Sequence, residues 1–371
     1  MIRLILISFF VLMLAVTSLA GAPVQPDLIR VALLKGVDSV AIGGNGILAV
    51  NEAGEPLKMG HSLFIKKGPT GFSVNGQTVS TLRVSASGQI QVNGKGYRGI
   101  IEISAVENGI LVIDELPVED YLIGLINCEI SSQWPIEVIK AQAVIARSYA
   151  LYQLEARKNA PYHLDSTVID QVYDGCDIED SRAARGVRET AGEVLKFNGK
   201  VIQAFYHSNC GGHTEAAENV WGYSLPYLQG VECKYCLSSG AGRWDLTIPL
   251  KKIESLLRGS GFQVGAIKDT KAGRRNISGR VVELTIFSTK GTLLIPGASF
   301  RKAVGYSAIK STNLEVKIVG TEVVFSGSGY GHGVGLCQWG AKQRGEEGFN
   351  YREILSYYYP GTELGKMYSG Q

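Results

Sequence analysis

Glu129 is the carboxylate in this sequence whose surroundings best suit acid–base chemistry. It follows an apolar run, residues 122–126, and Cys128, and Ile130 comes directly after it. An apolar setting raises the pKa of a carboxyl group, and a carboxyl group that keeps its proton near neutral pH can act as a general acid. The alternative is an ordinary glutamate at a helix end or in contact with solvent, because most glutamates are surface residues. Sequence spacing alone leaves both interpretations open.

Four residues form the strongest metal-binding pattern in the chain. Cys210 and His213 are separated by two residues, and after nineteen further residues Cys233 and Cys236 repeat the same spacing. Two such pairs are typical of a tetrahedral structural zinc site with three cysteines and one histidine. The alternative is disulfide formation, because the chain has six cysteines, an even number, and disulfides form where a protein reaches an oxidising compartment. In either case the group would hold the loop that follows His207.

The element that must position Glu129 is the helix predicted to follow it. Pro135 suits a first helical turn, where a missing N–H costs no hydrogen bond. From Ile136 onward, apolar residues recur at steps of three and four, which predicts an amphipathic helix that packs closely through small side chains. These residues are Ile136, Ile139, Ala143, Ala146 and Ala150.

Short apolar runs punctuated by Gly, Asn and Asp fill the chain from residue 28 to about residue 113. This pattern predicts an antiparallel β module, whose last two runs flank Asn108-Gly109 as a hairpin. The sequence therefore predicts an α+β protein with an N-terminal antiparallel β module over 23–113 and a mixed α/β region over 114–371. In the second region we expect helix over 181–193, strand over 200–206, strand then helix over 244–257, and strands over 281–288, 316–319 and 323–325.

Residues 1–22 have the layout of a secretory signal peptide. One early cation, Arg3, precedes an apolar run from Leu4 to about Leu19, and small residues follow. An uncleaved membrane anchor is the alternative. The formal net charge of +3 is too small to indicate nucleic-acid binding. We therefore expect an exported protein of the periplasm or cell envelope, which binds no nucleic acid and meets the membrane only through an uncleaved signal.

The chain from residue 116 resembles the core of the stage II sporulation protein D family, which are peptidoglycan-cleaving lytic transglycosylases and their relatives. The family pattern is a proline-led acidic segment, a Glu before a short turn, and a helix with Lys-Ala-Gln-Ala and Arg. Here these parts are residues 116–122 (LPVEDYL), Glu129, residues 140–143 (KAQA) and residues 146–150 (ARSYA). Two later segments also match, residues 207–222 (HSNCGGHTEAAENVWG) and 326–340 (SGSGYGHGVGLCQWG).

The resemblance implies that residues 114–371 form a glycan-cleaving core in which Glu129 acts as general acid and base and leaves 1,6-anhydro ends. The implied partners are peptidoglycan glycan strands and a cell-wall amidase. The alternative is a non-catalytic wall-binding protein that enhances a separate amidase, as some relatives are described. A metal-binding Cys-Asp-x-x-His-Cys loop of several relatives is not matched, because only His163 stands near its place. The substrate-binding residues implied by the resemblance are Lys140, Gln142, Arg147, His207, His332 and Gln338.

Overall fold

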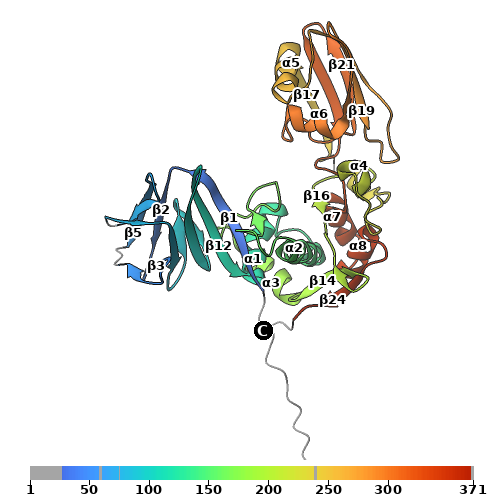
Figure 1. Ribbon diagram of the computed structural model, residues 1–371. Coiled ribbons are helices and arrows are strands. Elements are labelled where there is room, and N and C mark those ends of the chain that lie inside the picture. Colours follow the sequence, from blue (N-terminus) through green and yellow to red (C-terminus); the bar gives the residue numbers. More distant parts are fainter. Residues whose placement is uncertain (1–26, 58–60, 75, 238–239, 369–371) are drawn as a thin grey trace, which may run out of the picture.

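The computed structural model describes residues 27–368 except 58–60, 75 and 238–239, so the predicted signal peptide lies outside the described residues. The chain forms three lobes (Figure 1): an N-terminal β lobe, a central lobe built on helices, and a second β lobe. The α+β class predicted from the sequence is confirmed. Among the described residues, no helix is long and apolar enough to span a membrane.

The N-terminal β lobe consists of a seven-stranded and a six-stranded sheet, ordered β13-β1-β12-β11-β8-β3-β4 and β10-β9-β2-β5-β6-β7. Alternate residues point into a shared apolar core, as the period of a strand requires, so Ile29 and Val31 are buried in β1 and Val40 and Ile42 in β2. The strands are β1 (Leu28–Val37), β2 (Ser39–Gly44), β3 (Leu48–Asn51), β4 (Pro56–Leu57), β5 (Ser62–Lys67), β6 (Phe72–Val74), β7 (Gln77–Val79), β8 (Thr81–Ser85), β9 (Ile90–Val92), β10 (Lys95–Tyr97), β11 (Ile100–Val106), β12 (Gly109–Pro117) and β13 (Leu164–Asp165).

The hairpin predicted around Asn108-Gly109 is confirmed. Strands β11 and β12 pair antiparallel from Val106 opposite Gly109 outward. β12 runs on directly into α1 (Val118–Glu129), so the lobe is continuous with the helix that ends at Glu129. β13 comes from the central lobe and pairs in parallel with β1, which makes the larger sheet mixed.

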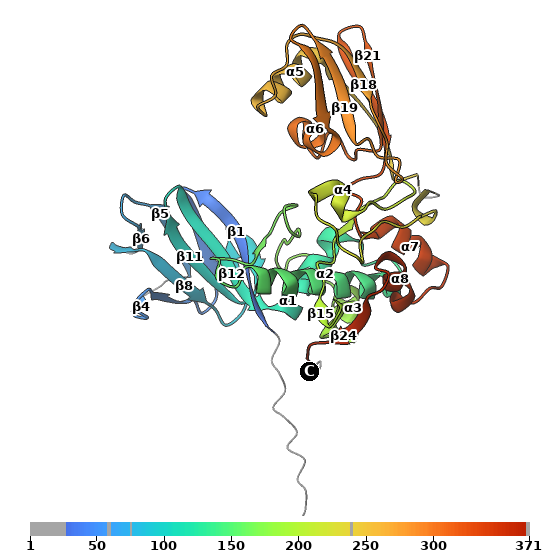
Figure 2. The same cartoon turned by 45° about the vertical axis from the view of Figure 1, so that its right-hand side comes forward.

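Helix α2 (Ile136–Ala156) runs through the middle of the central lobe (Figure 2). Fourteen of its 21 residues are buried, so it is a core helix covered on most sides rather than the amphipathic helix predicted from its spacing. It packs against α1, β14 (Glu193–Phe197), and the helices α3 (Ser181–Glu189), α7 (Gln338–Glu346) and α8 (Tyr351–Tyr358).

Short strands complete the central lobe. β14 pairs with β15 (Lys200–Val201) and β24 (Glu363–Lys366), while β16 (Tyr206–His207) pairs in parallel with β23 (Leu336–Cys337). The strand predicted over 200–206 is therefore divided, because its two ends pair with different partners. The helix predicted over 181–193 ends at Glu189, since Glu193 already pairs in β14. The remaining elements are α4 (Ala217–Trp221) and a 3₁₀ turn, η1 (Tyr235–Leu237).

The second β lobe has an apolar core of its own. It contains two three-stranded sheets, ordered β17-β22-β21 and β18-β19-β20. The elements predicted over 244–257, 281–288, 316–319 and 323–325 are confirmed, although β19 begins at Glu283. The elements are β17 (Arg243–Pro249), α5 (Leu250–Gly259), β18 (Ile267–Ala272), β19 (Glu283–Ser288), β20 (Gly291–Pro296), α6 (Gly297–Val304), β21 (Leu314–Val319) and β22 (Glu322–Ser328).

Buried polar contacts attach the second β lobe to the central lobe. Glu215 Oε2 accepts hydrogen bonds from Asn276 Nδ2 at 2.5 Å and from Ser278 Oγ at 2.7 Å. The buried guanidinium of Arg280 donates to the carbonyl of Cys210 at 2.9 Å. These polar groups are buried and hydrogen-bond to one another. Separating the two lobes would break these hydrogen bonds, which has a cost in free energy.

Candidate functional site

Glu129 is the last residue of α1, and groups from three distant segments hold its carboxylate. Oε1 accepts a hydrogen bond from the backbone N–H of Val172 at 3.1 Å, and Oε2 accepts one from Gln338 Nε2 at 3.4 Å. The side chain of Tyr206 is a third partner. Burial raises the pKa of Glu129 above its ordinary value, and the three hydrogen bonds offset this only in part. Glu129 therefore keeps its proton to a higher pH than a surface glutamate does.

A chain of polar side chains orients the Tyr206 hydroxyl. Gln171 Nε2 donates to Tyr206 Oη at 3.1 Å, and Gln171 Oε1 accepts from Tyr121 Oη at 3.2 Å. Because Tyr206 Oη accepts from Gln171, its own proton is directed to Glu129. Burial raises the pKa of Tyr206 well above its usual value, so this hydroxyl remains a donor across the physiological range.

Gln338 links Glu129 to the middle of α2. Gln338 Nε2 lies 3.4 Å from Glu129 Oε2 and also 3.4 Å from Gln142 Oε1. The Nε2 atom of Gln142 is buried and has no hydrogen-bond partner. An unpaired buried donor costs about 1–3 kcal/mol, so this atom marks a place for a further acceptor. Glu129, Gln142 and Gln338, which the sequence singled out from far-apart positions, thus lie together.

His207 and His332 lie side by side, with ring centroids 5.7 Å apart, and both are uncharged near neutral pH. His207 Nδ1 donates to the carbonyl of Val334 at 3.1 Å, whereas His332 Nδ1 accepts from the N–H of Val334 at 3.0 Å. Burial lowers the pKa of His207 well below its usual value and that of His332 to about 3. Neither ring can therefore serve as a cation, although His207 Nε2 is buried without a partner.

We call Glu129 and the side chains linked to it, those of Tyr206, Gln171, Gln338 and Gln142, the Glu129 group. Lys140 and Arg147 are not part of it. Lys140 Nζ forms an ion pair with Glu189 at 2.8 Å. The fully buried Arg147 makes a bidentate pair with Glu119, with both bonds at 2.8 Å, and donates to the carbonyl of Glu193 at 3.0 Å. With its guanidinium committed in this way, Arg147 holds α2 against α1 and β14.

Four buried cysteines bring their sulfur atoms within 4.8 Å of one another: Cys210, Cys233, Cys236 and Cys337. All four are free thiols, and the Cys210 and Cys236 sulfurs are 3.3 Å apart, far beyond the about 2.05 Å of a disulfide. With Zn–S bonds of about 2.3 Å, a tetrahedral site places its sulfurs about 3.8 Å apart, which lies within the observed range. This four-cysteine cluster could hold a metal ion such as zinc.

Cys337 takes the place that the sequence pattern assigned to His213. The Nδ1 atom of His213 lies 2.6 Å from the carbonyl of Thr214, and His213 is not a member of the cluster. The fourth sulfur comes instead from β23, which pairs with β16 just before Cys210. Backbone N–H groups of Cys210 and Gly340 donate to Cys337 Sγ at 3.2 and 3.4 Å, an environment that suits a thiolate ligand.

Three site residues were missed from the sequence: Tyr206, Gln171 and Cys337. Tyr206 directly precedes His207, and Cys337 directly precedes Gln338, so both stood beside residues already singled out. Gln171 lies in a loop whose polar composition carries no signal of a contact with Tyr206.

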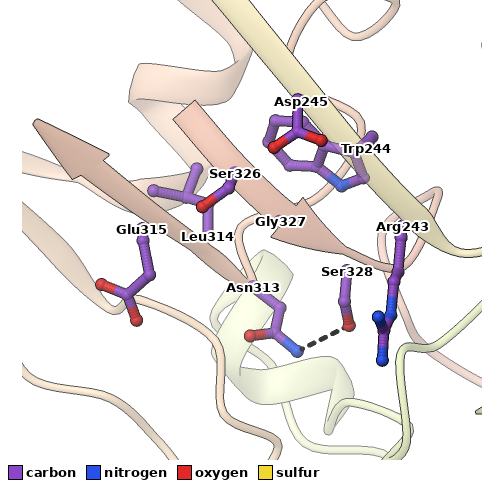
Figure 3. A pocket seen from close by; sticks show the side chains of 9 residues that line it. All are labelled: Arg243, Trp244, Asp245, Asn313, Leu314, Glu315, Ser326, Gly327 and Ser328. Atoms are coloured by element: carbon purple, nitrogen blue, oxygen red, sulfur yellow. Dashed lines mark hydrogen bonds between the residues drawn. The ribbon is translucent and has the colours of Figure 1, made fainter. Parts of the chain in front are cut away.

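A pocket of about 440 Å³ lies in the second β lobe, and Figure 3 shows the side chains that line it. It is lined by residues 243–245, 313–315 and 326–328, and Asn313 Nδ2 donates to Ser328 Oγ at 3.4 Å. Within the described part of the chain, none of these residues hydrogen-bonds to Glu129 or to its partners.

Two family profiles match the chain. The profile described as "Stage II sporulation protein" matches residues 106–197, which include Glu129, Gln142 and Gln171. A profile described only as a domain of unknown function matches residues 238–335, which contain the second β lobe.

Three curated relatives extend the similarity over most of the chain. An uncharacterized protein of Brachyspira hyodysenteriae is 34% identical over 74% of this chain and 73% of its own length. The amidase enhancer of Bacillus subtilis is 31% identical over 76% of this chain, but this match spans only 45% of the enhancer. Stage II sporulation protein D of Bacillus subtilis is 28% identical over 68% of this chain and 76% of its own length. This chain therefore belongs to the stage II sporulation protein D family.

Proposed function

We propose that this protein is a peptidoglycan lytic transglycosylase in which Glu129 is the general acid and then the general base. The observation that carries the proposal is a single carboxylate with a raised pKa, held by Val172, Tyr206 and Gln338. Among the described residues, no other carboxylate is a hydrogen-bond partner of Glu129. Ordinary glycosidases place two carboxyl groups about the scissile bond, whereas an enzyme that uses a hydroxyl of the substrate as nucleophile needs only one.

In the proposed reaction, Glu129 first donates its proton to the glycosidic oxygen as the bond from that oxygen to C1 breaks. The resulting carboxylate then takes the proton of the 6-hydroxyl of the same sugar as O6 bonds to C1. The proton thus returns to Glu129, no water is consumed, and the product is a 1,6-anhydro end. Tyr206 and Gln338 would hold the carboxylate in place during both steps.

Gln142 and Gln338 are the proposed contacts for the glycan. The unpaired Nε2 of Gln142 supports this, since a hydroxyl or acetamido oxygen of a sugar is an acceptor that would satisfy it. His207 and His332 would shape the site as neutral rings. Lys140 and Arg147 are left out of the proposed contacts because each already pairs with a carboxylate.

The similarity to an amidase enhancer supports a second candidate, a wall-binding protein that enhances a separate amidase. Digestion of purified peptidoglycan, first with this protein alone and then together with an amidase, separates the two. The transglycosylase gives anhydro-ended muropeptides without the amidase, which mass spectrometry detects by the loss of one water relative to a hydrolysed end. An enhancer gives no new ends alone and increases only the release of stem peptides.

The pH dependence of glycan cleavage should follow Glu129. Because the protonated form starts the reaction, kcat/KM is highest below the pKa of Glu129 and falls as the pH rises through it. Burial raises this pKa, so the falling limb should lie at higher pH than an ordinary carboxyl group gives. Gln338→Met removes a donor to the charged form and should move the limb to still higher pH. A limb that moves to lower pH in this variant would contradict the assignment.

We also propose that the four-cysteine cluster binds zinc and that the protein is exported to the cell envelope. Four thiolates close the coordination sphere, so the ion would be structural and would take no part in the reaction. The composition of residues 1–22 supports export.

A further inference from the structure

Two large aromatic side chains, Trp221 and Tyr223, are partly exposed to solvent, and the Trp221 ring lies close to that of His332. Trp221 is 37% exposed and Tyr223 is 43% exposed. Phe205 stacks on Trp221 with ring centroids 4.2 Å apart and an interplanar angle of 25°, and Tyr223 lies nearly parallel to Trp221 at 6.2 Å and 20°. We call Phe205, Trp221 and Tyr223 the aromatic platform. Grouped rings that stay exposed in this way are typical of a binding surface rather than of a core.

Local backbone geometry holds the aromatic platform in place. Helix α4 ends at Trp221, and Gly222 has a φ of +79°, a conformation that side chains disfavour. This turn brings Tyr223 back beside Trp221, and Tyr223 Oη lies 3.4 Å from Gln203 Oε1. The platform is therefore built before any ligand arrives, so that binding does not require its rings to be ordered.

The aromatic platform is linked to the residues around Glu129 through Phe205 and His332. Phe205 directly precedes Tyr206, which contacts the Glu129 carboxylate. The His332 ring lies 5.1 Å from Trp221 and 5.9 Å from Phe205. His332, which hydrogen-bonds with the backbone of Tyr206, therefore lies between the aromatic platform and a residue that holds the proposed catalytic carboxylate.

We propose that the aromatic platform is a subsite for an N-acetylhexosamine ring of the glycan strand, away from the scissile bond. A pyranose ring carries C–H groups on its faces, and these pack on the electron-rich face of an aromatic ring. The platform itself carries no charge, so it suits the uncharged face of a sugar ring better than the charged stem peptides. This inference takes its substrate from the proposed function, and it identifies the aromatic platform as the part of the protein that would bind the strand away from the scissile bond.

The test measures binding apart from cleavage. Glu129→Gln removes the proposed acid but leaves the aromatic platform unchanged, so this variant can be mixed with peptide-stripped glycan strands without digesting them. Adding Trp221→Ala or Tyr223→Ala should weaken binding about tenfold, because each substitution removes both the ring face and the large apolar area that it would bury against the sugar. Tyr223→Phe is the matched control and should bind as the parent does, because it keeps the ring.

Thermal melting of each variant checks that the fold is intact, and the exposed Tyr223 provides a second arm if Trp221→Ala is unstable. Parent-like binding by both alanine variants overturns the subsite, and so does binding that requires stem peptides. If the wild-type chain makes no anhydro ends and yet its glycan binding depends on Trp221 and Tyr223, the subsite stands and the proposed reaction fails. In a cleaving enzyme, the same substitutions should raise KM and leave kcat nearly unchanged.

Discussion

Glu129→Gln is expected to reduce the formation of 1,6-anhydro ends by about 10²–10⁴-fold, the contribution typical of a positioned general acid or base. Gln keeps the shape of Glu and can still accept from the Val172 N–H, but it has no proton to give to the glycosidic oxygen. The rate of appearance of anhydro muropeptides from purified peptidoglycan measures the effect. The thermal unfolding midpoint should stay near that of the wild type, because no charged partner of Glu129 is left unpaired.

Glu155→Gln is the matched control for this substitution. Glu155 lies near the end of α2 with a side chain that is 75% exposed, and it pairs with Lys158 on the surface. The same chemical change there should leave the rate unchanged. If Glu129→Gln makes anhydro ends as fast as Glu155→Gln does, Glu129 is not the acid and the transglycosylase assignment is lost.

Glu129 and Gln338 could be selected from the sequence because each lies in a motif that resembles the family. Val172 and Tyr206 could not be predicted as partners of Glu129, because these residues are far apart in the sequence and no local pattern relates them. The pairing of β16 with β23 sets Tyr206 beside Leu336, and so brings Tyr206 and Gln338, both partners of Glu129, near each other. Short-range spacing holds no information on such a pairing.

The same limit explains why the sequence pattern grouped His213, and not Cys337, with the other three cysteines. Spacing selected His213 because it stands near Cys210 in the chain, whereas Cys337 reaches the cluster across β16 and β23. Arg147 is a further case, since the sequence shows a cation on a helix and does not show that Glu119 pairs with it inside the protein. A charged residue in a motif can be kept for packing as readily as for substrate.

Local signals, by contrast, predicted the secondary structure well. The β11–β12 hairpin follows from Asn108-Gly109, and the start of α2 follows from Pro135, because turn and helix-start preferences depend on neighbouring residues. For α2, the helix itself was predicted correctly, but the extent of its burial was not. A stripe of apolar residues predicts one buried face, but polar members of this helix such as Gln142 and Arg147 are buried as well. Burial of this kind depends on the helices and strands that pack around α2, which are far from it in the sequence.

Cys337→Ser is expected to release the bound metal and to lower the thermal unfolding midpoint by about 10–20 °C. That shift corresponds to a loss of about 5 kcal/mol, less than the about 10–16 kcal/mol of apparent zinc binding in small zinc-finger peptides. Elemental analysis of protein purified without added metal should find about one zinc per wild-type chain and almost none in the variant. Cys176→Ser is the control, because Cys176 is buried but lies outside the four-cysteine cluster, and this variant should keep its zinc.

Loss of the metal is also expected to slow the reaction, because the metal would keep the residues that hold Glu129 in position. Cys337 is joined by a peptide bond to Gln338, and Cys210 follows Tyr206 and His207 within four residues, so two of the four proposed ligands lie in the segments that hold Glu129. Removal of zinc by a chelator should therefore lower both the unfolding midpoint and the rate of cleavage, and adding zinc back should restore both.

Counting the thiols distinguishes zinc from disulfides. Under denaturing, non-reducing conditions, disulfide-bonded cysteines stay blocked, whereas removal of zinc by a chelator leaves four titratable thiols. Unchanged zinc content in Cys337→Ser would exclude this ligand set and return His213 to consideration.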